Sequence, residues 1–168
     1  MELTVPIRVP RKTLLVEAGR TNGYAYFLEQ GITRSFWRIG DEEITTSFST
    51  SGDIVFSMDE LYYDRDSEEY VETLDPSECY RIAISDLRRL WETNLELCNW
   101  GRIIHQNEYR RLHRSHRDRL ALSAGERLAE FERQFPLLSN SVNLGYIASY
   151  LGMTQPTLSR IRAAKCRR

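Results

Sequence analysis

The segment from Leu144 to Ala163 carries the pattern of two short helices joined by a tight turn. Gly152 falls at the turn, where glycine adopts a positive φ at little cost. Thr154 is a good N-cap residue, and Pro156 falls in the first turn of the second helix. The residues at inward-facing positions are small or apolar: Ile147, Ala148, Leu151, Leu158 and Ile161. The segment therefore predicts a helix-turn-helix.

The outward face of the second predicted helix is polar and basic. Its candidate DNA-binding residues are Thr154, Gln155, Thr157, Ser159, Arg160, Arg162 and Lys165. Side chains of these types read base edges in the major groove and bind phosphates. We expect Gln155, Ser159 and Arg160 to face the groove, and Arg162 and Lys165 to contact the backbone. The predicted partner is double-stranded DNA, and the alternative is an ordinary helical hairpin.

Charge is divided unevenly along the chain. Residues 100–168 contain 13 Lys and Arg against 5 Asp and Glu, whereas residues 1–99 contain 10 against 19. The whole-chain charge of −1 therefore conceals a C-terminal half at +8 and an N-terminal half at −9. A basic half suits a polyanion, which the acidic half would repel. A charged dimer surface without nucleic acid would give the same asymmetry.

Residues 11–84 are rich in strand-forming residues that are interrupted by turn residues. The expected strands cover residues 12–19, 24–31, 32–39, 43–50, 54–56, 69–74 and 78–83. Gly40-Asp41 gives a hairpin signal, and Gly52-Asp53 begins a further turn. Many short antiparallel strands with regular turns predict a roll or barrel.

The pattern changes from strands to helices near Ser85. A capped short helix is expected at Ser85, a long helix over Leu95–Leu122, and another helix at the capping box Ser123–Glu126. The predicted fold class is α+β, with an N-terminal antiparallel β-roll, a long central dimerisation helix and a C-terminal helix-turn-helix. The expected domains are residues 1–84, 85–122 and 123–168.

An apolar stripe runs along the predicted long helix. It consists of Leu97, Trp100, Ile103, Ile104 and Leu112. The stripe can pack on the roll of its own chain, or it can pair with its copy in a second subunit. We favour a homodimer, because a single helix-turn-helix makes few base contacts and two half-sites raise the affinity.

Several other classes of function find no support in the sequence. No apolar run approaches the ~20 residues that span a bilayer, and no secretion signal is expected. Cys79, Cys98 and Cys166 are too widely spaced for a zinc motif or a disulfide framework, which favours the cytoplasm. His113 and His116 have chelating spacing, but flanking arginines favour a solvated basic face. No metal, cofactor or membrane association is therefore expected.

An enzyme on a small roll would need histidines and carboxylates that project inward from the strands. Residues 11–84 contain no histidine. The sequence also lacks nucleophile-elbow, phosphate-loop and dinucleotide-binding motifs. We therefore expect no enzymatic activity.

Taken in order along the chain, these features resemble the Crp/Fnr family of bacterial transcription regulators. Residues 12–19 resemble the first strand of the family roll, and residues 25–31 resemble its apolar-aromatic strand ending in Gly. Residues 51–56 resemble the Gly-Asp turn before the phosphate cassette, and residues 147–161 resemble short-tailed members common in Bacteroidetes. The resemblance implies a cyclic-nucleotide-binding-like roll, a homodimer and DNA binding.

The chain departs from the family pattern where cyclic nucleotides are held. In the family's cyclic-nucleotide binders, a Gly-Glu pair holds the ribose, and an Arg-Ser or Arg-Thr pair holds the cyclic phosphate. Those positions fall on Phe56-Ser57 and Ser67-Glu68 in this chain. The phosphate-binding cation is absent, and neighbouring carboxylates surround the one nearby cation, Arg65. We expect no cyclic AMP binding in the family's usual manner, and an unidentified small-molecule effector is left open.

The main hypothesis is a DNA-binding transcription regulator whose sensor domain has lost the cyclic-phosphate-binding Arg and the ribose-binding Glu. The alternative is a ligand-binding or protein-interaction module without sequence-specific DNA binding. The two differ in a measurable way, because a regulator shows a steep dependence on salt and a preferred sequence.

Overall fold

The computed structural model describes residues 3–165 and divides the chain into two compact units, residues 1–101 and 102–168. The strands are β1 (Thr4–Val9), β2 (Leu14–Val16), β3 (Tyr24–Gln30), β4 (Thr33–Ile39), β5 (Glu42–Ser49), β6 (Ile54–Val55), β7 (Tyr70–Thr73) and β8 (Ser77–Ala83). The helices are α1 (Met58–Tyr63), α2 (Ile84–Thr93), α3 (Leu95–Ala121), α4 (Ala124–Gln134), α5 (Leu138–Ser141), α6 (Leu144–Tyr150) and α7 (Gln155–Lys165). The boundary between the units falls within α3.

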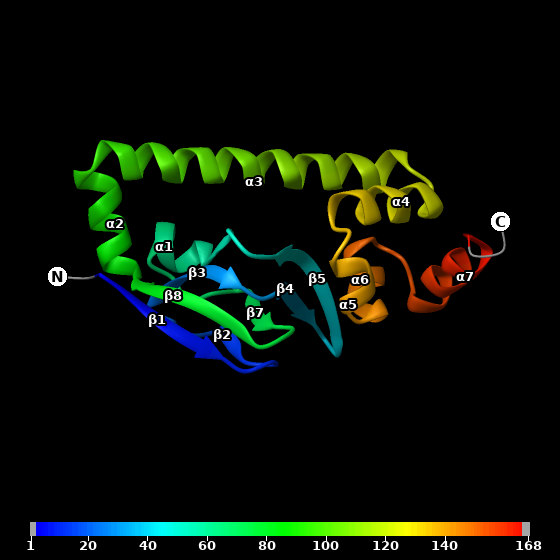
Figure 1. Ribbon diagram of the computed structural model, residues 1–168, viewed down its shortest axis with the longest axis horizontal. Helices are drawn as coiled ribbons and strands as arrows, with labels where there is room; N and C mark the ends of the chain where they lie inside the picture. Colours follow the sequence, from blue (N-terminus) through cyan, green and yellow to red (C-terminus); the bar gives the residue numbers. More distant parts are fainter. Residues whose placement is uncertain (1–2, 166–168) are drawn as a thin grey trace. The chain divides into compact units, whose positions relative to one another are not determined.

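Two four-stranded antiparallel sheets form the first unit (Figure 1). Their strand orders are β1-β8-β3-β6 and β2-β7-β4-β5. Tyr26 and Leu28 of β3 share a buried cluster with Val16 and Val71 of the other sheet, so the core lies between the sheets. The predicted α+β class with antiparallel strands is confirmed.

A second apolar cluster lies where helices cover the β1-β8-β3-β6 sheet. Successive side chains of a strand point to opposite faces, so Ala25 and Ile82 lie on the face away from the inter-sheet core. They pack with Leu61 of α1 and Leu87 of α2, and all four are almost fully buried. This packing attaches both helices to the sheet.

The other sheet contains a buried cation, Arg34 of β4, whose exposed fraction is 1%. Its guanidinium lies 2.6 Å from a carboxylate oxygen of Glu43 and 2.6 Å from one of Glu72. Burial alone would raise the pKa of Glu43, but hydrogen bonds and charge from Arg34 outweigh burial and lower it. Two carboxylates pair with Arg34, so an anionic ligand at this cation would meet two negative charges.

The second unit is helical. Leu128, Phe131, Leu138, Ile147 and Leu158 form its buried interior, with exposed fractions of 2% or less. The predicted capping box is confirmed, because the Ser123 side chain accepts from the Glu126 N–H and the Glu126 side chain accepts from the Ser123 N–H. Among residues 3–165, no helix is both long enough and apolar enough to cross a lipid bilayer.

Three elements and one cap differ from the sequence-based expectation. The sequence analysis expected no strand or helix over the residues that form β1, α1 and α5. β1 is an edge strand that contains Pro6, and proline within a strand is tolerated at an edge. The expected Ser85 cap is wrong, because α2 begins at Ile84 with Ala83 at its N-cap. The finer division into residues 1–84, 85–122 and 123–168 stays a prediction.

Candidate nucleic-acid interface and ligand site

The turn between α6 and α7 is fixed by glycine and by backbone hydrogen bonds. Gly152 adopts φ +65°, a conformation that residues with a side chain rarely tolerate. The Gly152 N–H donates to the Ser149 carbonyl, and the Met153 N–H donates to the Ala148 carbonyl, each at 3.0 Å. This pair of bonds is a Schellman motif, which satisfies the last carbonyls of α6. The turn predicted from Gly152 is confirmed.

The inner faces of α6 and α7 are closed by small and apolar side chains. Ile147 and Leu158 are fully buried, and Ala148 is 1% exposed. Thr154 caps α7, because its hydroxyl accepts from the Thr157 N–H at 3.4 Å. The inner face therefore sets which side of α7 points outward.

The outward side of α7 carries the polar residues that the sequence analysis selected. Thr154, Gln155, Ser159 and Arg160 are exposed, and Thr157 is half-buried. The Arg160 guanidinium is held only loosely within the chain, by a 3.4 Å hydrogen bond to the Thr157 hydroxyl. These side chains form one polar surface that we call the α7 face.

Two other predicted DNA contacts already have partners within the chain. The Arg162 guanidinium donates to the carbonyl and to the hydroxyl of Ser139, both at 2.9 Å. The Lys165 ammonium pairs with Glu132 of α4. Both residues thus tie α7 to neighbouring helices, and a DNA phosphate would have to replace or share these partners.

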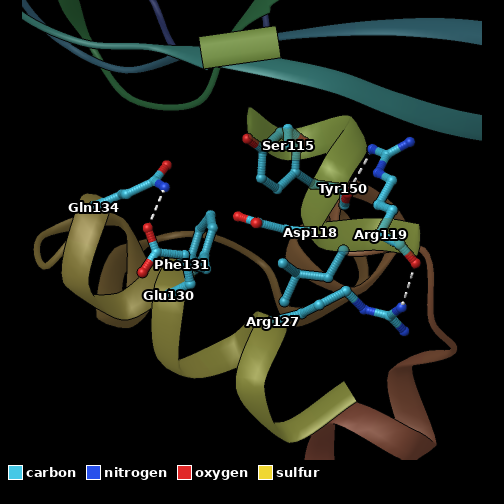
Figure 2. Close-up of a pocket in the computed structure, with 9 residues that line it drawn as sticks. Ser115, Asp118, Arg119, Arg127, Glu130, Phe131, Gln134 and Tyr150 are labelled. Carbon is cyan, nitrogen blue, oxygen red and sulfur yellow. Dashed lines mark hydrogen bonds between the residues drawn. The ribbon is translucent and has the colours of Figure 1, made fainter. Parts of the chain in front are cut away.

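Arginine side chains also join the end of α3 to α4 and α6 around a small pocket of about 30 Å³ (Figure 2). The Arg119 guanidinium donates to the Tyr150 carbonyl at the end of α6, at 2.6 Å. The Arg127 guanidinium donates to the Arg119 carbonyl, at 3.2 Å. Positive charge at helix C-termini is favourable, so the two arginines stabilise the helix ends that carry α7.

Asp118 lines the same pocket (Figure 2) and is 6% exposed. Its carboxylate accepts from the neighbouring Arg117 at 2.6 Å. The pocket is too small for an organic ligand and has room for about one water molecule. We therefore assign it to the structure of the second unit.

In the first unit, Ser57 and Ser67 are two of the four residues at the cassette positions, which are Phe56, Ser57, Ser67 and Glu68. Both serines form hydrogen bonds within the chain. Ser57 is 2% exposed and caps α1, because its hydroxyl accepts from the Glu60 N–H at 3.2 Å. Ser67 is also 2% exposed, and its hydroxyl donates to the Glu69 carbonyl at 2.9 Å. Both hydroxyls therefore serve the local backbone.

Glu60 is a buried residue of this region that the sequence analysis missed. Its carboxylate accepts from the Gly23 N–H at 2.6 Å and from the Asn22 N–H at 2.9 Å. From α2, the Arg88 guanidinium donates to the carbonyls of Leu61 and Glu60 and pairs with Asp64. The capping-box spacing Ser57–Glu60 was the available signal for α1, although Glu60 binds the loop and not Ser57.

The other residues of this segment are an aromatic side chain, a carboxylate and one exposed cation, Arg65. Phe56 packs against the cluster beneath α1 and α2, and Glu68 is exposed. Arg65 is exposed, with its guanidinium 5.9 Å from the centre of the Tyr63 ring. Partial burial raises the pKa of Tyr62 to about 12, and 43% of the residue is exposed.

The predicted dimer residues fall into two groups. Leu97 and Trp100 line a groove of their own unit, and the Trp100 ring lies 5.7 Å from that of Phe27. Ile104 is half-buried, whereas Ile103 and Leu112 are 43% and 50% exposed. The structure thus places some of these side chains at the surface of α3 and others against the roll.

Potential metal ligands do not gather in the described part of the chain: residues 3–165 contain no cluster of three or more His, Cys, Asp or Glu side chains able to hold a metal ion. Cys79 is a buried thiol and Cys98 an exposed one, and neither is in a disulfide. Cys166 lies outside the described residues.

The fold closely matches those of several solved regulators. FixK2 from Bradyrhizobium japonicum superposes with a TM-score of 0.82 at 17% identity, over 97% of this chain and 84% of that one. The c-di-GMP responsive regulator CLP from Xanthomonas campestris gives 0.72 at 20% identity, over 98% and 87%. A protein assigned to the Crp/Fnr family of transcriptional regulators, from Eubacterium rectale, gives 0.77 at 11% identity, over 98% and 79%.

No protein-family model and no curated protein sequence matches the chain. The solved structures are all less than 25% identical to it, so their similarity establishes the architecture. The chain therefore has the fold of the Crp/Fnr-type transcription regulators, including their cyclic-nucleotide-binding-like roll.

Proposed function

We propose that this protein is a transcription regulator of the Crp/Fnr type that binds double-stranded DNA in a sequence-specific manner. The observation that carries the proposal is the α7 face, on which Gln155, Ser159 and Arg160 point away from a closed α6–α7 core. The N-terminal residues of a recognition helix contact base edges in this type of module. The charge of +8 over residues 100–168 supports the same partner.

Within this proposal, Arg160 contacts a guanine edge and Gln155 contacts an adenine edge or a phosphate. Arg160 suits this role because its hydrogen bond to the Thr157 hydroxyl is long, so little is lost when it turns toward DNA. Arg162 and Lys165 first hold α7 in place and contact the backbone only by sharing their present partners.

We also propose that the regulator works as a homodimer through α3. Ile103 and Leu112 are exposed apolar residues of that helix, and Tyr109 and Leu120 are 71% and 77% exposed. Burying such side chains against a second copy is favourable. Leu112→Asp should dissociate the dimer, which sedimentation would detect. A monomeric parent at high concentration contradicts this part of the proposal.

The proposed sensor does not use a cyclic nucleotide in the family's usual manner. Ser57 and Ser67 are committed to local hydrogen bonds, and Arg34 is neutralised by Glu43 and Glu72. We propose no enzymatic activity. Binding to chromosomal DNA would place the protein in the cytoplasm, where its thiols stay reduced.

The test is selection of bound duplexes from a random pool, with and without small molecules from a cell extract. The selected duplex is then measured against Arg160→Ala, which should lose roughly 1–3 kcal/mol and relax preference at one base position. Arg110→Ala is the matched control, because it removes the same charge from an exposed position on α3.

Three results bear on the proposal. A preferred, palindromic duplex with a steep dependence on salt supports it. Weak binding to all duplexes without salt dependence supports a protein-interaction module instead. If Arg160→Ala binds the selected duplex as tightly as the parent does, the assignment of Arg160 is wrong.

A further inference from the structure

An apolar groove of about 430 Å³ lies in the first unit, beside the start of α3. The β1-β8-β3-β6 sheet forms its floor, and α2 and α3 form its walls. The apolar side chains that matter for its shape are Phe27, Ile82, Leu90, Trp91, Leu97 and Trp100. None of the cassette positions contributes to it. Volumes of about 300–1,000 Å³ with mainly apolar and aromatic linings are typical of small-molecule sites.

The two indole rings of the groove are fixed by packing. A Cβ atom at Gly101 would lie 2.9 Å from the Trp91 ring, so only glycine lets this ring rest against α3. Glycine inside a helix costs about 1 kcal/mol relative to alanine, and at Gly101 the absence of a side chain leaves room for the Trp91 ring. Trp91 also stacks on Tyr62 with ring centres 6.4 Å apart, and Trp100 packs on Phe27.

The charge around the groove favours neutral and cationic ligands over anionic ones. Its polar lining consists of Thr4 and the exposed carboxylate of Glu96. The net charge of −9 over residues 1–99 adds to the negative potential. Organic anions are therefore repelled, while neutral or cationic aromatic molecules are accepted, and a cation also gains from the faces of aromatic rings.

We propose that this groove binds a flat aromatic amine, neutral or singly protonated, between Trp91, Trp100 and Leu97, with its nitrogen toward Glu96. The site is separate from the cassette, and binding there does not depend on DNA binding. Coverage by a second copy of the chain is the competing occupant.

The proposal is tested on the full chain with N-phenyl-1-naphthylamine, a neutral aromatic amine that fluoresces in apolar surroundings. Trp37→Phe leaves Trp91 and Trp100 as the two tryptophans, since the sequence contains three. We expect saturable probe binding with one site per chain and simultaneous quenching of tryptophan emission. Leu97→Glu places a charge in the apolar wall and should weaken binding by about tenfold or more. Circular dichroism checks that this variant is folded.

Glu96→Lys provides a second variant that leaves the interior intact, because Glu96 is exposed. It should weaken 1-naphthylmethylamine, a cation, by about fivefold and leave the neutral probe unchanged. Absence of saturable binding overturns the proposal, as does binding that the folded Leu97→Glu variant does not alter. If the probe binds only at dilutions where the chain is monomeric, a second copy of the chain covers the groove in the dimer. That result also overturns the proposal. None of these outcomes bears on DNA binding.

Discussion

Replacing Glu60 with glutamine tests how firmly α1 is held to the roll. The Glu60 side chain is buried and accepts two backbone N–H groups, from Asn22 and Gly23. Glutamine keeps one acceptor oxygen but turns an NH2 group toward the second N–H. One charge-assisted hydrogen bond is lost, and a buried donor then faces another donor.

The size of the effect follows from these two contacts. A hydrogen bond to a charged group contributes about 1.5–3 kcal/mol, and an unsatisfied buried donor costs about 1–3 kcal/mol. We therefore expect Glu60→Gln to lower the free energy of unfolding by roughly 2.5–6 kcal/mol. Since domains are stable by about 5–15 kcal/mol, this loss is a large fraction of the total.

Urea unfolding followed by tryptophan fluorescence measures this loss in the first unit alone. Trp37, Trp91 and Trp100 all lie within residues 1–101, and residues 102–168 contain no tryptophan. Asp59→Asn is the matched control, because its carboxylate accepts one exposed 3.2 Å hydrogen bond from the Glu68 N–H and asparagine can still accept it. If Glu60→Gln loses less than about 0.5 kcal/mol, the assigned hydrogen bonds do not hold α1.

Three further predictions concern the turn, a carboxylate and the cassette. Gly152→Ala should destabilise the second unit by about 1 kcal/mol because of the positive φ, and an unchanged helical melting curve contradicts this. Hydrogen bonds from Arg133 hold the pKa of Glu130 at about 2. Its contribution to stability is therefore present above its ordinary pKa and lost as the pH falls toward 2, so parent and Glu130→Gln should differ at pH 7 and converge at pH 2. Calorimetry with cyclic AMP should show an affinity about two orders of magnitude or more below that of a site with a bidentate arginine. Saturation at low micromolar concentration would mean that another cation of the chain binds the cyclic phosphate.

The sequence was most informative where a residue type has one structural use. Gly152 marked the turn because few residues accept its φ, and Ser123 with Glu126 marked a helix start because their side chains exchange hydrogen bonds. The alternating strand pattern also located most strands of both sheets, since one face of each strand had to be buried. Such signals are local, so they can be seen without knowing the fold.

The features that were missed depend on contacts between distant segments. Glu60 looked like one of many acidic residues, and its role appears only when the loop at Asn22 lies beside α1. Trp100 fitted a helical stripe, but its neighbour Phe27 lies 73 positions earlier in the chain, and spacing along one helix cannot reveal that contact. The outward or inward direction of a side chain on α3 was likewise undetermined from periodicity, because both faces contain apolar residues.

The attachment of Glu60 to the chain has a consequence for how signals reach the protein. A diffusing metabolite occupies its site in proportion to its concentration, whereas a tethered carboxylate has a fixed and high local concentration beside its partners. Because the Asn22 and Gly23 amides are occupied in this way, the position of α1 is insensitive to rises and falls of small anions.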